Sequence, residues 1–96
     1  MGAATFVTRA KGKTAKEAFD NAVRQAQYDH GHSGYTGTIA EKHSCVQIPL
    51  PPGRDAREYA WELINQCDQR IDDKWGPAGY FKTGDDEFLF FGWASE

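Results

Sequence analysis

The chain has 96 residues, of which 40% are hydrophobic and 26% charged, and its formal net charge is −3. These values predict one folded domain over residues 1–96 and argue against a disordered chain. The acidic balance and the scattered lysines and arginines argue against a nucleic-acid partner. Residues 1–6 lack the basic and apolar segments of a secretory signal, and no window nears 18 apolar residues. We therefore expect a cytoplasmic protein without a membrane span, in which Cys45 and Cys67 are buried free thiols.

The first half of the chain predicts a strand, a helix and a second strand. Residues 4–10 are rich in β-branched and aromatic types, which favours a strand. Thr14 and Glu17 form a capping box ahead of apolar residues at helical spacing, and Gly31 suits the end of that helix. Residues 32–38 predict a loop. Residues 39–50 predict extended chain with a bulge or bend near Lys42, where the apolar side switches.

The second half predicts a long helix and a hairpin. Asp55 is expected to cap a helix whose apolar stripe continues to Trp75, with Gly76 and Pro77 as its stop. Two aromatic segments, 79–82 and 87–93, flank a Gly/Asp turn and predict the hairpin. The predicted order is β-α-β-α-β-β. The predicted fold class is α+β, a two-layer sandwich in which a mostly antiparallel sheet carries two helices on one face.

The loop after the first helix has an unusual composition, which makes it a candidate for binding a ligand or a partner. Its glycines and hydroxyl residues could present backbone N–H groups to an anion such as a phosphate. It follows a helix C-terminus, where the dipole has the wrong sign for an anion, and a simple turn into a strand explains it as well. The candidate residues are His32, Ser33, Gly34, Tyr35, Thr36, Gly37 and Thr38.

Part of this loop and the residues after it form the segment Gly-Tyr-Thr-Gly-Thr-Ile-Ala-Glu-Lys, residues 34–42. It resembles a segment of small uncharacterised proteins of phage and bacterial genomes, and the resemblance covers about residues 28–42. The resemblance implies a short accessory protein, phage-borne, that acts by binding a host component such as a defence complex. It implies no activity and no binding residues.

Two further groups of residues are candidates for a site. His30, His32, His43 and Cys45 offer four nitrogen and sulfur ligands, the set that a tetrahedral zinc ion takes. The aromatic C-terminal strand either is central and covered on both faces or leaves an aromatic face open, and an open face would mark an interface, most simply a homodimer. The interface candidates are Tyr80, Phe88, Phe91 and Trp93.

Three functions follow from these candidates. The first is a non-enzymatic binding module that holds a protein partner, its own copy included, through the loop and the aromatic face. The second is a binder of a phosphate or nucleotide that uses the loop, with Tyr35 or Tyr80 stacked on a ring. The third is a small zinc-binding protein. No catalytic or cofactor motif of high specificity is present, so an enzyme would need a site assembled in three dimensions.

Overall fold

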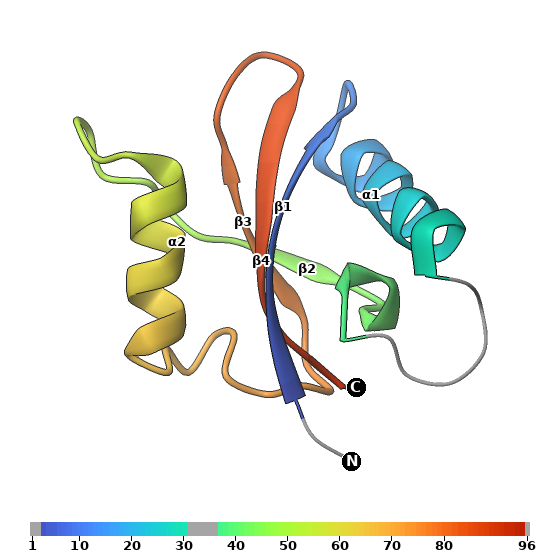
Figure 1. Cartoon of the computed structure of the whole chain (residues 1–96). Coiled ribbons are helices and arrows are strands. Elements are labelled where there is room, and N and C mark those ends of the chain that lie inside the picture. Colours follow the sequence, from blue (N-terminus) through green and yellow to red (C-terminus); the bar gives the residue numbers. More distant parts are fainter. Residues whose placement is uncertain (1–2, 31–36, 96) are drawn as a thin grey trace.

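A computed structural model describes residues 3–30 and 37–95 (Figure 1). It contains four strands, two α-helices and one short 3₁₀ helix. In chain order they are β1 (Ala3–Lys11), α1 (Ala15–His30), the 3₁₀ helix η1 (Ile39–Glu41), β2 (Cys45–Gln47), α2 (Ala56–Asn65), β3 (Ala78–Lys82) and β4 (Glu87–Ser95). The predicted α+β class and the predicted order of strands and helices are confirmed. None of the described helices is both long enough and apolar enough to cross a bilayer.

The four strands form one sheet in the order β1-β4-β3-β2. β4 pairs antiparallel with β1 on one side and with β3 on the other. β2 pairs parallel with β3, so the sheet is mixed. Because β4 is the last of the described strands and yet a central one, the sheet is complete only when β4 has inserted between β1 and β3.

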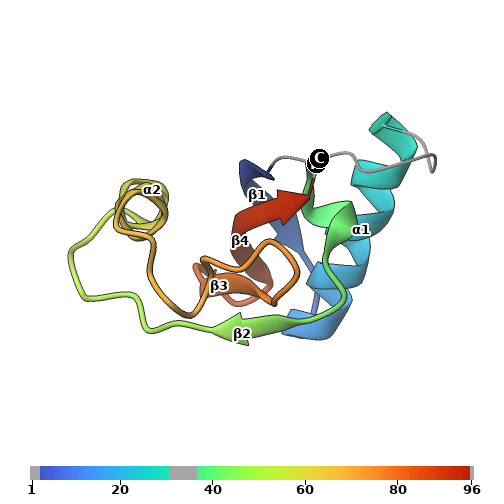
Figure 2. The ribbon, with the colours of Figure 1, turned by 90° about the horizontal axis from the view of Figure 1, so that it is seen from below.

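The two helices cover opposite faces of this sheet, as the view along it shows (Figure 2). Ala18, Phe19 and Ala22 of α1 pack against Phe88 and Phe90 of β4. The α2 side chains join a second cluster with the other face of β4, as described below. The prediction that both helices lie on one face is therefore wrong. The chain moves from β1 to the far edge at β2 and then back to β3, and crossovers that run in opposite directions and share the preferred right hand put their helices on opposite faces.

β4 is buried on both faces because it lies between these two clusters. Phe88 and Phe90 point toward α1, whereas Leu89 and Phe91 point toward α2. The ring centroids of Phe81 and Phe91 are 4.6 Å apart. This position explains the continuous apolar run of residues 88–91, which an alternating half-buried strand would not need.

Both helices begin where the sequence predicts. The Thr14 hydroxyl accepts a hydrogen bond from the Glu17 N–H at 3.2 Å, and the Asp55 carboxylate accepts one from the Glu58 N–H at 3.0 Å. Each cap satisfies an N–H group that has no partner within the helix. The predicted end of α1 at Gly31 lies outside the described residues.

The second helix ends at Asn65, ten residues before the predicted end at Trp75. Cys67 has φ 53°, its N–H donates to the Ile64 carbonyl, and the Asp68 N–H donates to the Leu63 carbonyl. This pair of bonds is the Schellman termination, which places a left-handed residue just after the helix. The prediction of helix up to Trp75 is wrong because the apolar stripe is shared by two segments. Ile71 remains buried, whereas Trp75 is 61% exposed.

Replacing Cys67 by glycine is expected to stabilise the fold. A non-glycine residue in the left-handed region costs roughly 1–2 kcal/mol, and the larger freedom of glycine in the unfolded chain offsets part of the gain. We expect Cys67→Gly to raise the free energy of unfolding by about 0.5–1 kcal/mol, measured by urea denaturation. Cys67→Ala, which keeps a Cβ and removes the thiol, should leave it nearly unchanged. An equal gain in both variants would assign the effect to the exposed thiol and not to the backbone.

The segment predicted as extended chain over residues 39–50 is mostly not a strand. Residues 39–41 form η1, and β2 contains three residues. The bend expected near Lys42 therefore takes the form of a helical turn. Lys42 itself is buried, and its ammonium group donates to the carbonyls of Asp73, Lys74 and Gly76 at 3.2, 3.2 and 2.9 Å. One side chain thereby holds the irregular connection between α2 and β3.

Candidate functional site

The ligand loop predicted over residues 32–38 is described only at its end. His32, Ser33, Gly34, Tyr35 and Thr36 lie outside the described residues. Gly37 has φ 69°, and its N–H donates to the Ser95 carbonyl at 2.9 Å. The Thr38 hydroxyl accepts a hydrogen bond from the Ala40 N–H at 3.2 Å and so caps η1. The Gly37 bond ties the end of the loop to the end of β4, and the anion-binding hypothesis remains a prediction.

The predicted zinc ligands are described in part. The His30 side chain and His32 lie outside the described residues, and His43 is exposed in a bend before β2. Cys45 packs against the α1-side core, and burial, with a smaller contribution from Asp20, raises the pKa of its thiol. Among residues 3–29 and 37–95, no three His, Cys, Asp or Glu side chains lie close enough to hold a metal ion. The zinc hypothesis thus depends on the two undescribed histidine side chains. The other cysteine, Cys67, is exposed, contrary to the expectation of two buried thiols.

The predicted aromatic interface is not a surface. Phe88 is 4% exposed and Phe91 is fully buried, because β4 is central and a helix covers each of its faces. Tyr80 and Trp93 are partly buried at the margins of the two clusters, and the Tyr80 ring contacts Phe88 and Phe90. The prediction of an interface at Phe88 and Phe91 is therefore wrong.

The outer edge of β1 is the largest unpaired feature of the described sheet. β1 pairs with β4 over nine consecutive residues without interruption, and no described strand pairs with its other side. The opposite edge differs: β2 has three residues, and Pro49, Pro51 and Pro52 follow shortly after it. Short strands and prolines prevent edge pairing, whereas a long regular strand presents backbone donors and acceptors to another chain.

The hydrogen bonds at the end of β1 show which backbone groups face outward. The Gly12 N–H donates to the Asp86 carbonyl at 2.9 Å, next to the paired residues Lys11 and Glu87. Because hydrogen-bonded positions alternate along an antiparallel pair, the even-numbered residues of β1 bond to β4 and the odd-numbered residues point outward. The Asn21 side chain confirms this alternation, since it donates to the outward Lys11 carbonyl at 2.9 Å. The N–H and C=O groups of Thr5, Val7 and Arg9 therefore face away from the sheet.

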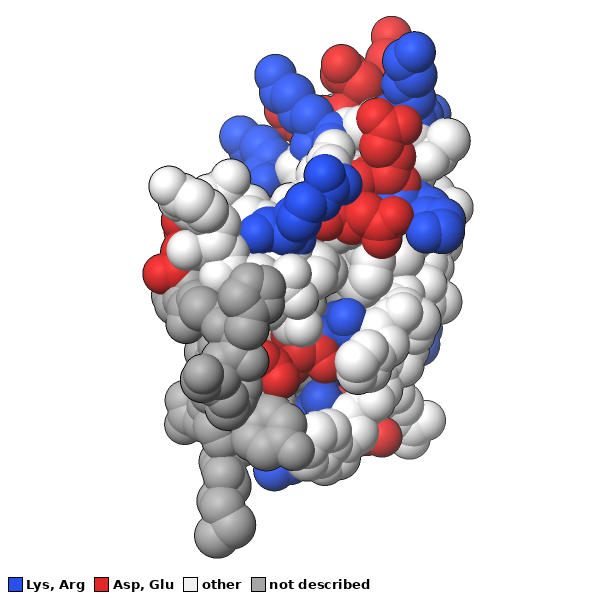
Figure 3. Space-filling view, turned by 90° about the vertical axis from the view of Figure 1, so that its right-hand side faces the viewer, with Lys and Arg blue, Asp and Glu red and all other residues white. Residues whose placement is uncertain are grey.

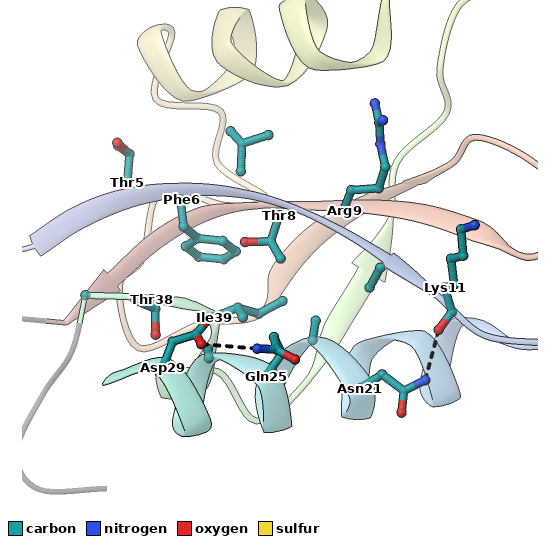
Figure 4. A pocket seen from close by; sticks show the side chains of 15 residues that line it. Thr5, Phe6, Thr8, Arg9, Lys11, Asn21, Gln25, Asp29, Thr38 and Ile39 are labelled. Atoms are coloured by element: carbon teal, nitrogen blue, oxygen red, sulfur yellow. Dashed lines mark hydrogen bonds between the residues drawn. The ribbon is translucent and has the colours of Figure 1, made fainter. Parts of the chain in front are cut away.

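A groove of about 410 Å³ runs along this edge, between β1 and α1 (Figure 4). Its floor includes Phe6, Ala22, Ala26 and Ile39, which are apolar. Polar side chains of α1 lie along it at one-turn intervals, namely Asn21, Gln25 and Asp29. Gln25 donates to the Asp29 carboxylate at 3.1 Å. The groove has the apolar floor and the few convergent polar groups that typify binding sites.

Charge is distributed unevenly along the groove. Lys11 and Arg9 stand where β1 ends, whereas Asp29 and Thr38 stand where β1 begins (Figure 4). Arg9 lies 3.8 Å from the Glu87 carboxylate on the neighbouring strand. On the α1 side of the molecule, basic and acidic side chains intermingle at one end, and this face shows no continuous basic stripe (Figure 3). The Arg9 and Lys11 side chains point away from α1, so their charges lie on the opposite face of β1 from Asp29 (Figure 4).

Sequence reasoning missed this site because it depends on strand order. Residues 3–8 carry no charge and no proline, which is the local signal of an edge open to pairing. The same signal fits a central strand, and the sequence does not show that β4 lies on only one side of β1.

Comparison with known proteins finds no match: no protein-family model, no curated protein and no solved structure matches this chain.

Proposed function

We propose that the protein is a non-enzymatic interaction module that binds an extended segment of polypeptide by strand addition along β1. The observation that supports this proposal is the open edge of β1, whose outward backbone groups face a groove floored by α1. Strand addition gains affinity from main-chain hydrogen bonds and specificity from pockets for alternate side chains.

The β1 edge would bind the backbone of an added strand, and the groove would hold the side chains on one of its faces. Its backbone would pair with Thr5, Val7 and Arg9, the three outward residues in the middle of β1. Every second side chain would then lie on the α1 side, over Ala26 and beside Gln25. Those positions favour small or amide side chains, because large apolar groups would meet the polar row of α1.

The test uses peptides selected from a random display library on the immobilised protein. Thr5→Pro removes one outward N–H without breaking the ladder to β4. Gln47→Pro is the matched control, since the Ile48 N–H bonds to the Tyr80 carbonyl, so that the preceding amide faces away from β3 on the other edge. We expect selected peptides to lose about tenfold or more in affinity for Thr5→Pro and to keep it for Gln47→Pro.

The melting temperature of each variant verifies folding before binding is compared. Peptides that bind the wild type and both proline variants equally well would contradict the proposal. Hydrogen exchange gives a second test, because a bound strand should slow exchange of the Val7 and Arg9 amides and leave the Gln47 amide unchanged.

A further inference from the structure

We infer that the strand that pairs with β1 is β1 of a second copy of this chain, in antiparallel orientation about a two-fold axis. This inference rests on the proposed function and names the partner. Pairing of this kind is isologous: the same residues of both copies form it, and the two four-stranded sheets become one continuous sheet.

The sequence of β1 suits antiparallel pairing with itself. A register centred on Val7 places its outward backbone groups against the same groups of the second copy. Arg9 then lies across from Thr5 of the second copy, and Lys11 lies across from Ala3. Like charges do not meet, and each long basic side chain lies opposite a small one.

The basic side chains of β1 favour the same orientation. Arg9 and Lys11 both lie at the end of β1. Antiparallel pairing places these two residues of one copy at the opposite end of the seam from the same two residues of the other copy. Parallel pairing in register would instead place Arg9 beside Arg9 and Lys11 beside Lys11, which costs free energy.

The two faces of the joined sheet would differ. An axis perpendicular to the sheet keeps equivalent faces on the same side, so the two copies of α1 flank the seam together. Asn21 and Gln25 of each copy would face the added strand, and Tyr28, which is 86% exposed, lies on the same part of α1. The seam would therefore be covered by helices on one face and open on the other.

The experiment measures the dimer dissociation constant of the full chain by sedimentation velocity from micromolar to submillimolar concentration. Three substitutions at Thr5 give different results if the inference is correct. Thr5→Pro should leave a folded monomer. Thr5→Glu places a carboxylate opposite Arg9 of the second copy, twice in each dimer, and should tighten the dimer about fivefold. Thr5→Arg places like charges there and should weaken it about fivefold.

Gln47→Pro, Gln47→Glu and Gln47→Arg are the matched controls on the opposite edge and should leave the dissociation constant unchanged. A wild-type monomer throughout this range would overturn the inference, and so would a dimer that is insensitive to the Thr5 series. Neither result would contradict strand addition itself, because the selected peptides test the β1 edge with a different chain.

Discussion

Replacing Lys42 by methionine is expected to lower the free energy of unfolding by about 3 kcal/mol, or the melting temperature by roughly 12–24 °C. The side chain is 3% exposed, and its ammonium group donates to three carbonyls of the α2–β3 connection. Methionine preserves the length and apolar body of the side chain but leaves the three oxygens without their donor. Charged donors contribute more than neutral ones, and unpaired buried acceptors add a further cost.

The environment of Lys42 both destabilises and stabilises the charged form of its side chain. Burial lowers the pKa of this lysine from its ordinary value, and the neighbouring Asp73 carboxylate acts in the opposite direction. The carbonyl oxygens of residues 73, 74 and 76 accept hydrogen bonds from the buried ammonium group and so replace the water that burial removes from it. The contribution of Lys42 to stability is therefore a difference between desolvation and hydrogen bonding, as for other buried charges.

Urea denaturation monitored by tryptophan fluorescence measures this effect. Lys82→Met is the matched control: it removes the same charge from an exposed position on β3 and should change stability by less than about 0.5 kcal/mol. A Lys42→Met variant as stable as this control would show that water replaces the ammonium group without cost.

The second large effect is expected for Gly79→Ala in β3. A Cβ at this position would lie 2.7 Å from Ile71 Cγ2, 2.9 Å from Ile48 Cδ1 and 3.0 Å from Phe91 Cε2. All three neighbours are buried on the α2 side, so none can move into solvent. We expect a loss of about 2–3 kcal/mol, because one inserted carbon forces several packed side chains to shift.

Gly84→Ala is the control for this substitution. Gly84 lies in the β3–β4 turn, where an added Cβ would meet the Glu87 Cβ at 3.5 Å, an ordinary contact. That variant should be neutral or slightly stabilised, since alanine restricts the unfolded chain. Equal stability of the two variants in a thermal melt would mean that the contacts of Gly79 are looser than the geometry indicates.

Local signals in the sequence identified the starts of both α-helices and the β3–β4 hairpin correctly. Thr14 and Asp55 cap their helices through neighbouring side chain–backbone bonds, so nearby residues suffice to predict them. The β3–β4 hairpin is local in the same sense, and the turn between its strands forms where predicted, with the Thr83 and Gly84 N–H groups donating to the Glu87 carbonyl. For these features the local preference and the tertiary structure agree.

The errors occur where distant residues decide the structure. Ile71 continues the apolar spacing of α2, but it reaches the core after the chain has turned at Cys67, and periodicity does not distinguish the two cases. Lys42 appears as a polar interruption of a strand, whereas its partners lie 31 to 34 residues further along the chain. The candidate groove was missed for the same reason, because the edge position of β1 follows from the insertion of β4.

That insertion also has a consequence for how the protein forms. β1 is synthesised early, but its partner β4 is the last of the described strands to leave the ribosome. The pairing of Ala3 with Ser95 can therefore form only after β4 has been synthesised. Until then β1 and β3 each lack the strand that lies between them, and both edges of β1 are open to strands of other chains. Contacts between residues so far apart in sequence slow folding, since a long loop must close before they form. We therefore expect the nascent protein to aggregate through β1 more readily than the folded protein, until β4 covers one edge of that strand.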